Sequence, residues 1–124
     1  MFLDKSKNIL SLMGVRFKKK IKIKSSFEWG NFMFTLFFNF LNFSCNKDIL
    51  CCAKSFFKSD IPIKNLRSEG FDIDIELAAY ITKNNMGRQI QQISLIYNRR
   101  SVEEGKKLKI SDGWKILKRL FLVV

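Results

Sequence analysis

Three carboxylates alternate along one stretch of the chain, and their spacing could support chemistry: Asp72, Asp74 and Glu76. Paired carboxylates act as general bases or bind a divalent cation. On a strand all three would point to the same face, whereas on a helix Asp72 and Glu76 would be neighbours. The alternative is the acidic first turn of a helix, where the helix dipole favours negative charge. The sequence favours this second interpretation and leaves the first open.

A basic cluster near the end of the chain has the residue types that bind phosphate. Arg99, Arg100 and Ser101 are followed by Gly105 and Lys106. Arg offers a planar fork of donors to a phosphate, and a hydroxyl group and a glycine amide would complete an anion site. The alternative is a solvated surface, where groups of Arg and Lys are more often found.

Other side chains that often carry chemistry are few. The chain has 124 residues and no His, which excludes Ser-His-Asp and Cys-His catalysis and His-ligated metals. Its three Cys form no C-x-x-C pair, so no disulfide framework is expected. The adjacent Cys51 and Cys52 are predicted to be small buried apolar side chains. With 47% hydrophobic residues, the chain has enough apolar material for one domain, which we place at residues 1–124.

The formal charge of +12 is unevenly distributed. Residues 1–24 and 97–124 each carry eight Lys and Arg side chains, against one and three acidic ones, while residues 25–96 are neutral. A phosphate-bearing ligand, an anionic membrane surface and nucleic acid would each be attracted. Nucleic acid is the least expected partner, because the aromatic residues are gathered in one run and are not interleaved with the cations as stacking platforms would be.

The hydrophobic pattern predicts alternating strands and helices, and therefore an α/β fold. Strands are predicted over residues 9–13, 49–57 and, less regularly, 88–97. Helices are predicted over residues 73–84 and 112–123. The second of these helices is expected to place four apolar side chains on one face: Trp114, Leu117, Leu120 and Phe121.

The run Phe27–Phe43 is the most aromatic part of the chain. A bilayer-spanning helix needs about 20 apolar residues, whereas this run has 17 and is interrupted by Glu28, Gly30 and three Asn. Two interpretations stay open. The run is either a core helix of the domain or a helix that lies in the membrane interface, since aromatic residues next to a polybasic block such as Lys18–Lys24 are typical of such anchors.

Five segments follow one another in an order that matches a known pattern. They are Gly14-Val15-Arg16-Phe17, Trp29-Gly30-Asn31, Asp48-Ile49-Leu50-Cys51-Cys52-Ala53-Lys54, Gly70-Phe71-Asp72-Ile73-Asp74-Ile75-Glu76-Leu77, and Tyr97-Asn98-Arg99-Arg100-Ser101-Val102-Glu103-Glu104-Gly105-Lys106-Lys107 with Asp112-Gly113 after it. Together they resemble family 2 glycosyltransferases of the dolichyl-phosphate mannose synthase type, which transfer a sugar to a polyprenyl phosphate. The resemblance covers residues 10–120, and Val15 departs from the usual Ser.

The resemblance implies an incomplete glycosyltransferase A-type fold: the carboxyl-terminal half, with few strands and an aromatic amphipathic helix. The family's nucleotide-sugar half, with its Asp-x-Asp metal motif, would precede Met1, and Asp72-Ile73-Asp74 falls at a different element. The resemblance therefore implies no metal site in this chain, Mg²⁺ or Mn²⁺ in the complete enzyme, and no turnover by the chain alone. The alternative is a non-catalytic membrane-associated or partner-binding module.

Carried over residue by residue, the resemblance implies two groups of site residues. Those expected to hold phosphate are Arg16, Lys54, Arg100, Ser101 and Lys106. Those expected to be catalytic, on the acceptor and sugar side, are Asp48, Asp72 and Asp74. The implied partners are a polyprenyl-phosphate lipid, the membrane surface and a separately encoded amino-terminal half. Such a protein would be cytoplasmic and peripheral at the membrane face.

Overall fold

The computed structural model describes residues 9–16, 26–84, 89–96, 103–105 and 109–123. In chain order the elements are β1 (Ile9–Val15), α1 (Ser26–Asn42), β2 (Lys54–Phe56), the short 3-10 helices η1 (Lys58–Asp60) and η2 (Ile63–Asn65), α2 (Ile73–Asn84), β3 (Gln89–Ser94) and α3 (Ile110–Leu122).

Strand β1 is the centre of a three-stranded sheet with the order β2-β1-β3. It pairs antiparallel with β2, where Leu12 lies opposite Ser55, and parallel with β3, where Leu12 lies opposite Gln91. A parallel pair requires a long crossover connection, which here contains α1, β2 and α2. The backbone beside the sheet is closely packed, because a Cβ added at Gly14 would lie 3.0 Å from the Sγ of Cys51. This mixed arrangement confirms the predicted α/β class.

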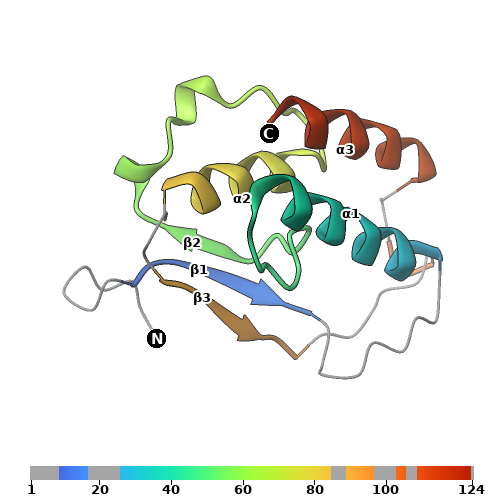
Figure 1. Ribbon diagram of the computed structural model, residues 1–124. Helices are drawn as coiled ribbons and strands as arrows, with labels where there is room; N and C mark the ends of the chain where they lie inside the picture. The colour runs from blue at the N-terminus through green and yellow to red at the C-terminus, as the bar shows by residue number, and fades with distance from the viewer. Residues whose placement is uncertain (1–8, 17–25, 85–88, 97–102, 106–108, 124) are drawn as a thin grey trace.

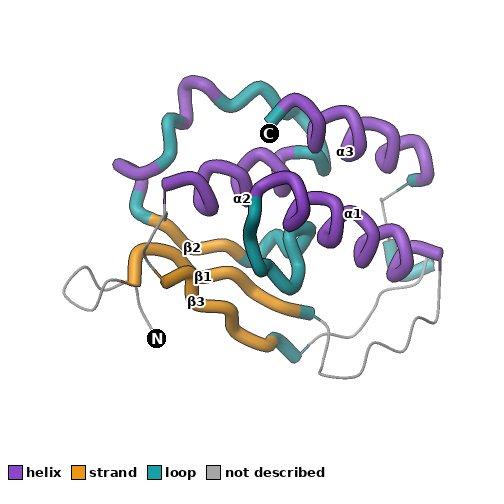
Figure 2. The backbone as a smooth tube through the Cα atoms, viewed as in Figure 1, coloured by secondary structure: helices purple, strands orange, loops and turns teal. Residues whose placement is uncertain are grey.

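The three helices of the described chain cover one face of the sheet (Figure 1). Helices α1 and α2 lie over the strands, and α3 packs against both of them (Figure 2). The core fills the space between these layers, and its fully buried members include Met13, Phe38, Ile75, Ile81 and Leu120. Burial of one such side chain contributes roughly 1.5–3 kcal/mol. The strands and all three helices therefore depend on one shared core.

Helix α1 buries two polar side chains together with Phe38, and it exposes several aromatic ones. Its buried residues are Asn31, Thr35 and Phe38. The outward side chains recur at helical spacing and form an aromatic face, which consists of Trp29, Phe32, Leu36, Phe37, Phe40 and, just after the helix, Phe43. Phe40 is 77% exposed and Phe43 is 98% exposed. An amphipathic helix of a globular domain has the opposite polarity, so the aromatic face is not explained by the core.

Most of the elements predicted from the sequence are confirmed. Helix α1 lies in the predicted run 27–43, and α2 has the predicted bounds. Strand β1 extends the predicted strand to Val15, and β3 occupies the middle of the predicted strand 88–97.

The strand predicted over 49–57 is wrong except for its last part, Lys54–Phe56. Ile49 and Cys51 are buried in a loop, where the Ile49 amide lies 3.5 Å from the hydroxyl of Thr35 on α1. A short buried apolar run has the same pattern in a loop as in a strand, so periodicity could not separate the two.

Helix α3 was predicted at the right place but with the wrong apolar face. Its buried side chains are Ile116 and Leu120, one turn apart, which pack against α2 and α1. The sequence predicts Trp114 and Phe121 on one face with Leu120, but they are 73% and 63% exposed, whereas Leu120 is buried. The apolar residues of this helix extend beyond the side that contacts α1 and α2. More than one helical face therefore fitted the sequence pattern.

Candidate functional site

Asp48 and Arg16 form a bidentate ion pair near α1. The Nε of Arg16 donates to Oδ2 of Asp48 at 2.8 Å, and its Nη2 donates to Oδ1 at 3.0 Å. The backbone amide of Arg16 lies 3.2 Å from Oδ2, and the Asn31 side-chain amide lies 3.4 Å from Oδ1. The Asp48 side chain is 0% exposed, whereas that of Arg16 is 22% exposed. The end of β1 therefore places the guanidinium group over a fully buried carboxylate.

Lys54 and Asp74 form a second ion pair, at 2.9 Å, between β2 and the first turn of α2. The Lys54 side chain is only 2% exposed, and its Nζ also donates to the backbone carbonyl of Cys51. A buried ammonium group requires such partners, because burial without them would cost several kcal/mol. Lys54 is therefore committed to two acceptors of the protein.

Asp72 turns away from Asp74 and binds a cation of α3. Its Oδ2 accepts from Nε of Arg119 at 3.1 Å, and Nη2 of Arg119 donates to the carbonyl of Arg67 at 3.2 Å. Burial alone would raise the pKa of Asp72, but hydrogen bonds from Arg119 and Ser68 outweigh burial and hold this pKa below its ordinary value of 3.8. The two carboxylates of Asp72-Ile73-Asp74 thus serve different cations, which does not fit a shared divalent metal.

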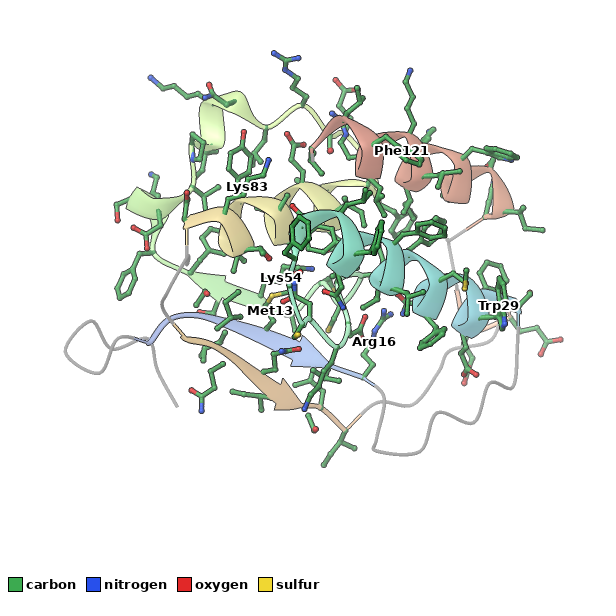
Figure 3. All side chains as sticks on the ribbon, viewed as in Figure 1. Met13, Arg16, Trp29, Lys54, Lys83 and Phe121 are labelled. Carbon is green, nitrogen blue, oxygen red and sulfur yellow. The ribbon has the colours of Figure 1, made fainter. Side chains whose placement is uncertain are left out.

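The first two ion pairs meet at Cys51. Burial raises the pKa of the Cys51 thiol, and the charges of Asp48, Arg16 and Lys54 also act on it. Figure 3 shows Arg16 and Lys54 between the sheet and the helices that cover it. Asn31 is 7% exposed, and its Oδ1 accepts no hydrogen bond from any residue in the described part of the chain.

Comparisons of the chain with protein-family models, with curated proteins and with solved structures find no match. The function of the chain is therefore inferred from its own sequence and geometry. Within the described ranges, no three His, Cys, Asp or Glu side chains are grouped as metal ligands would be, and none of the helices is both long and apolar enough to cross a bilayer.

The predicted site residues divide into three sets. Arg16, Asp48, Lys54 and Asp74 come together around Cys51, while Asp72 lies one residue before α2 and faces α3. The remaining predicted phosphate ligands lie outside the described residues and stay predictions: Arg100, Ser101 and Lys106.

The cations that pair with Asp48, Asp72 and Asp74 were not predicted from the sequence. Nothing in the local pattern relates Arg119 to Asp72, which lies 47 residues earlier. The role of Asn31 inside the domain was also missed. Its sequence signals were an amide within an aromatic run and its place in the segment Trp29-Gly30-Asn31. The structure explains this position by the buried carboxylate of Asp48 that the amide faces.

Glu76 anchors the loop before α2. Its carboxylate accepts hydrogen bonds from the Arg67 amide at 3.1 Å, the Ser68 amide at 2.9 Å and the Ser68 hydroxyl at 2.6 Å. Burial alone would raise the pKa of Glu76, but these donors outweigh burial and hold it below the ordinary value of 4.5. Glu76 is therefore a charged structural anchor, which agrees with the helix-start interpretation of the acidic cluster.

The Glu76→Gln variant should be less stable than the wild type by about 1–3 kcal/mol at pH 7, because an amide group cannot accept all of these donors. A lowered pKa in the folded state means that the carboxylate stabilises the fold above pH 4.5 and that this contribution disappears as pH falls through the lowered value. The difference between wild type and variant should therefore shrink below pH 4.5.

Urea unfolding from pH 7 to pH 3 measures this difference. Glu69→Gln is the matched control, because Glu69 is exposed and lies in the same loop. A gap between wild type and Glu76→Gln that stays constant over the whole pH range would contradict the assigned role of the charge.

Proposed function

We propose that this chain is the acceptor-side half of a polyprenyl-phosphate glycosyltransferase of family 2, and that it needs a nucleotide-sugar-binding half for turnover. One observation carries the proposal. Four of the five segments that resemble the family meet around the buried Asp48 and Cys51, although they are spread from Gly14 to Asp74. Arg16 and Lys54 both act on the Cys51 thiol, and each is held by a carboxylate, which supports a built site because like charges gathered in one place need counter-charges.

Within this site the cations have different roles. Arg16 is held by Asp48 but remains partly exposed, so its guanidinium group is the part of the cluster that a phosphate from solvent reaches. Lys54 is buried and bound to Asp74 and to the Cys51 carbonyl. It therefore positions the loop that contains Cys51 and adds positive charge to the site without contacting the phosphate. In our proposal Arg100, Ser101 and Lys106 supply the remaining phosphate contacts.

This chemistry makes small demands on acid-base catalysis. The acceptor phosphate is already anionic and is itself the nucleophile, so orientation and charge neutralisation lower the barrier. Asp48 and Asp74 then act by holding Arg16 and Lys54 in place. A divalent metal would be bound by the nucleotide-sugar half, where it would neutralise the diphosphate.

The aromatic face of α1 supports a membrane surface as the place of action. Trp and Phe side chains that face outward beside basic residues bind the interface of an anionic bilayer. Helix α3 adds the exposed Trp114 and Phe121 together with the exposed Lys115 and Lys118. Helix α1 therefore offers apolar insertion, and α3 offers apolar insertion together with electrostatic attraction, with each basic residue near the surface contributing about 1 kcal/mol.

Vesicles that contain polyprenyl phosphate test the proposal. The chain should sediment with them at least several-fold better than with control vesicles in which phosphatidylserine replaces polyprenyl phosphate at the same total charge. Arg100→Ala should abolish this preference, while the control Lys58→Ala, at an exposed position in η1 that is not part of the cluster, should keep it. Binding to both vesicle types should fall as salt rises.

The second candidate is a non-catalytic membrane-associated module. It is favoured by the observation that Asp48, Asp72 and Asp74 each already hold a cation of the protein, at 2.8 to 3.1 Å. Equal binding to both vesicle types would favour this candidate and contradict the first. Formation of glycolipid by the chain alone from labelled nucleotide-sugar and polyprenyl phosphate, above the level of Arg100→Ala, would contradict both.

A further inference from the structure

A cavity of about 570 Å³ lies on the other side of α2 from the Asp48 cluster. It is bounded by η2 and Arg67 just after it, by α2 and by the carboxyl-terminal end of α3. Figure 1 shows these three parts side by side, where the segment between β2 and α2 arches over α2 toward the end of the chain. Its volume is in the range of small-molecule sites.

Four cations line this cavity: Lys64, Arg67, Lys83 and Arg119. The lining carboxylate is Glu76. Arg119 also pairs with Asp72 behind the wall, so two positive charges remain in excess after both carboxylates are counted. Like charges gathered in one concave site repel each other and attract a multivalent anion.

Two of the four cations are held by hydrogen bonds to the protein, and the other two are available to a ligand. Arg119 is held by Asp72 and by the Arg67 carbonyl, and Lys83 Nζ donates to the Val123 carbonyl at 2.5 Å. Glu76 is occupied by the amides and hydroxyl of the preceding loop. The exposed head groups of Lys64 and Arg67 have no carboxylate partner within the described part of the chain.

The remaining lining is suited to an organic body. Ala79, Leu122 and Val123 form an apolar part of the wall, and Tyr80 also lines the cavity. Inorganic phosphate would use the cations and leave this surface in water. A phosphorylated organic molecule would use both, since Arg and Lys bind its phosphates while the apolar wall covers its carbon skeleton.

We propose that this cavity binds a small phosphorylated organic molecule carrying at least two negative charges, at a site separate from the Asp48 cluster. Lys64 and Arg67 make the phosphate contacts, and Tyr80 and Leu122 contact the organic part. The bound molecule would contact α2, whose first turn carries Asp74. Arg119, which lines the cavity, also forms an ion pair with Asp72 just before this helix.

Isothermal titration with ATP and with pyrophosphate tests this site in the full chain. Lys64→Ala combined with Arg67→Ala should weaken ATP binding at least tenfold. The control pair Lys47→Ala and Lys58→Ala removes the same charge at exposed positions outside the cavity and should change binding less than twofold. Leu122→Ser should weaken ATP binding several-fold and leave pyrophosphate binding unchanged.

Equal weakening by the two charge pairs would overturn the proposal, because attraction would then follow net charge alone. No binding of either probe at millimolar concentration would also overturn it. So would an acidic peptide that binds at the cavity and that ATP cannot displace, since the site would then take a protein segment. Vesicle binding by the Lys64 and Arg67 variant is measured in parallel, so failure of this site is distinguishable from failure of the membrane proposal.

Discussion

The Asp48→Ala variant should lose about 3–5 kcal/mol of unfolding free energy, because removal of one partner leaves the other charge of a buried pair uncompensated. The carboxylate is 0% exposed and accepts from the Arg16 side chain and backbone amide and from Asn31. All of these donors would lose their acceptor together. The loss is a large part of the 5–15 kcal/mol that folded domains typically have.

Urea unfolding at pH 7 measures this loss, and two further variants identify its cause. Asp48→Asn keeps the volume and part of the hydrogen bonding, so it should fall between wild type and Asp48→Ala. Glu69→Ala removes an exposed carboxylate and should change stability by less than about 0.5 kcal/mol. A cost below about 1 kcal/mol for Asp48→Ala would show that the ion pair contributes little.

Two phenylalanines of α1 should respond in opposite ways to the same substitution. Phe38 is 0% exposed and belongs to the core, whereas Phe40, two residues later, is 77% exposed on the aromatic face. Phe38→Ala should therefore cost about 3–5 kcal/mol of stability through lost burial and a cavity. Phe40→Ala should change stability by less than about 0.5 kcal/mol.

In vesicle sedimentation the order of the two effects should be reversed: Phe40→Ala should affect binding more than Phe38→Ala. Phe40→Ala should reduce binding to anionic vesicles several-fold, because the lost ring removes apolar surface from the aromatic face. Phe38→Ala should leave binding unchanged at a temperature where the variant is still folded. Loss of stability in Phe40→Ala, or unchanged vesicle binding, would mean that the aromatic face packs inside an assembly and does not meet lipid.

The elements that follow from local pattern were predictable, and those that depend on distant contacts were not. Helix α2 follows from the spacing of its apolar residues and its acidic first turn. In the Ile49–Ala53 loop, Ile49 and Cys51 are buried as alternate residues of a strand would be, but Cys52, which the sequence predicted to be buried, is exposed because the loop turns it outward. The outward face of α3 depends on how α3 meets α1 and α2, which no local pattern contains.

The same difference applies to the candidate site. The family-like segments picked out Arg16, Asp48, Lys54 and Asp74, and the structure brings these side chains together. Their pairing was not predictable, because a sequence does not say which cation meets which carboxylate. Arg16 and Lys54 were expected to await phosphate, yet each is already held by a carboxylate of the protein.

The order of the strands has a consequence for how the chain folds during synthesis. Strand β1 is the first element of the sheet, but its parallel partner β3 is made only after α1, β2 and α2. At the usual speed of translation, roughly 5–20 residues per second, β3 follows β2 by a few seconds. Over that time α1 is complete while the central strand still lacks one neighbour. Contacts between such distant segments also form slowly because of the entropy of closing the chain between them. Helix α1, with its aromatic face, is therefore made before the sheet beneath it can receive its third strand.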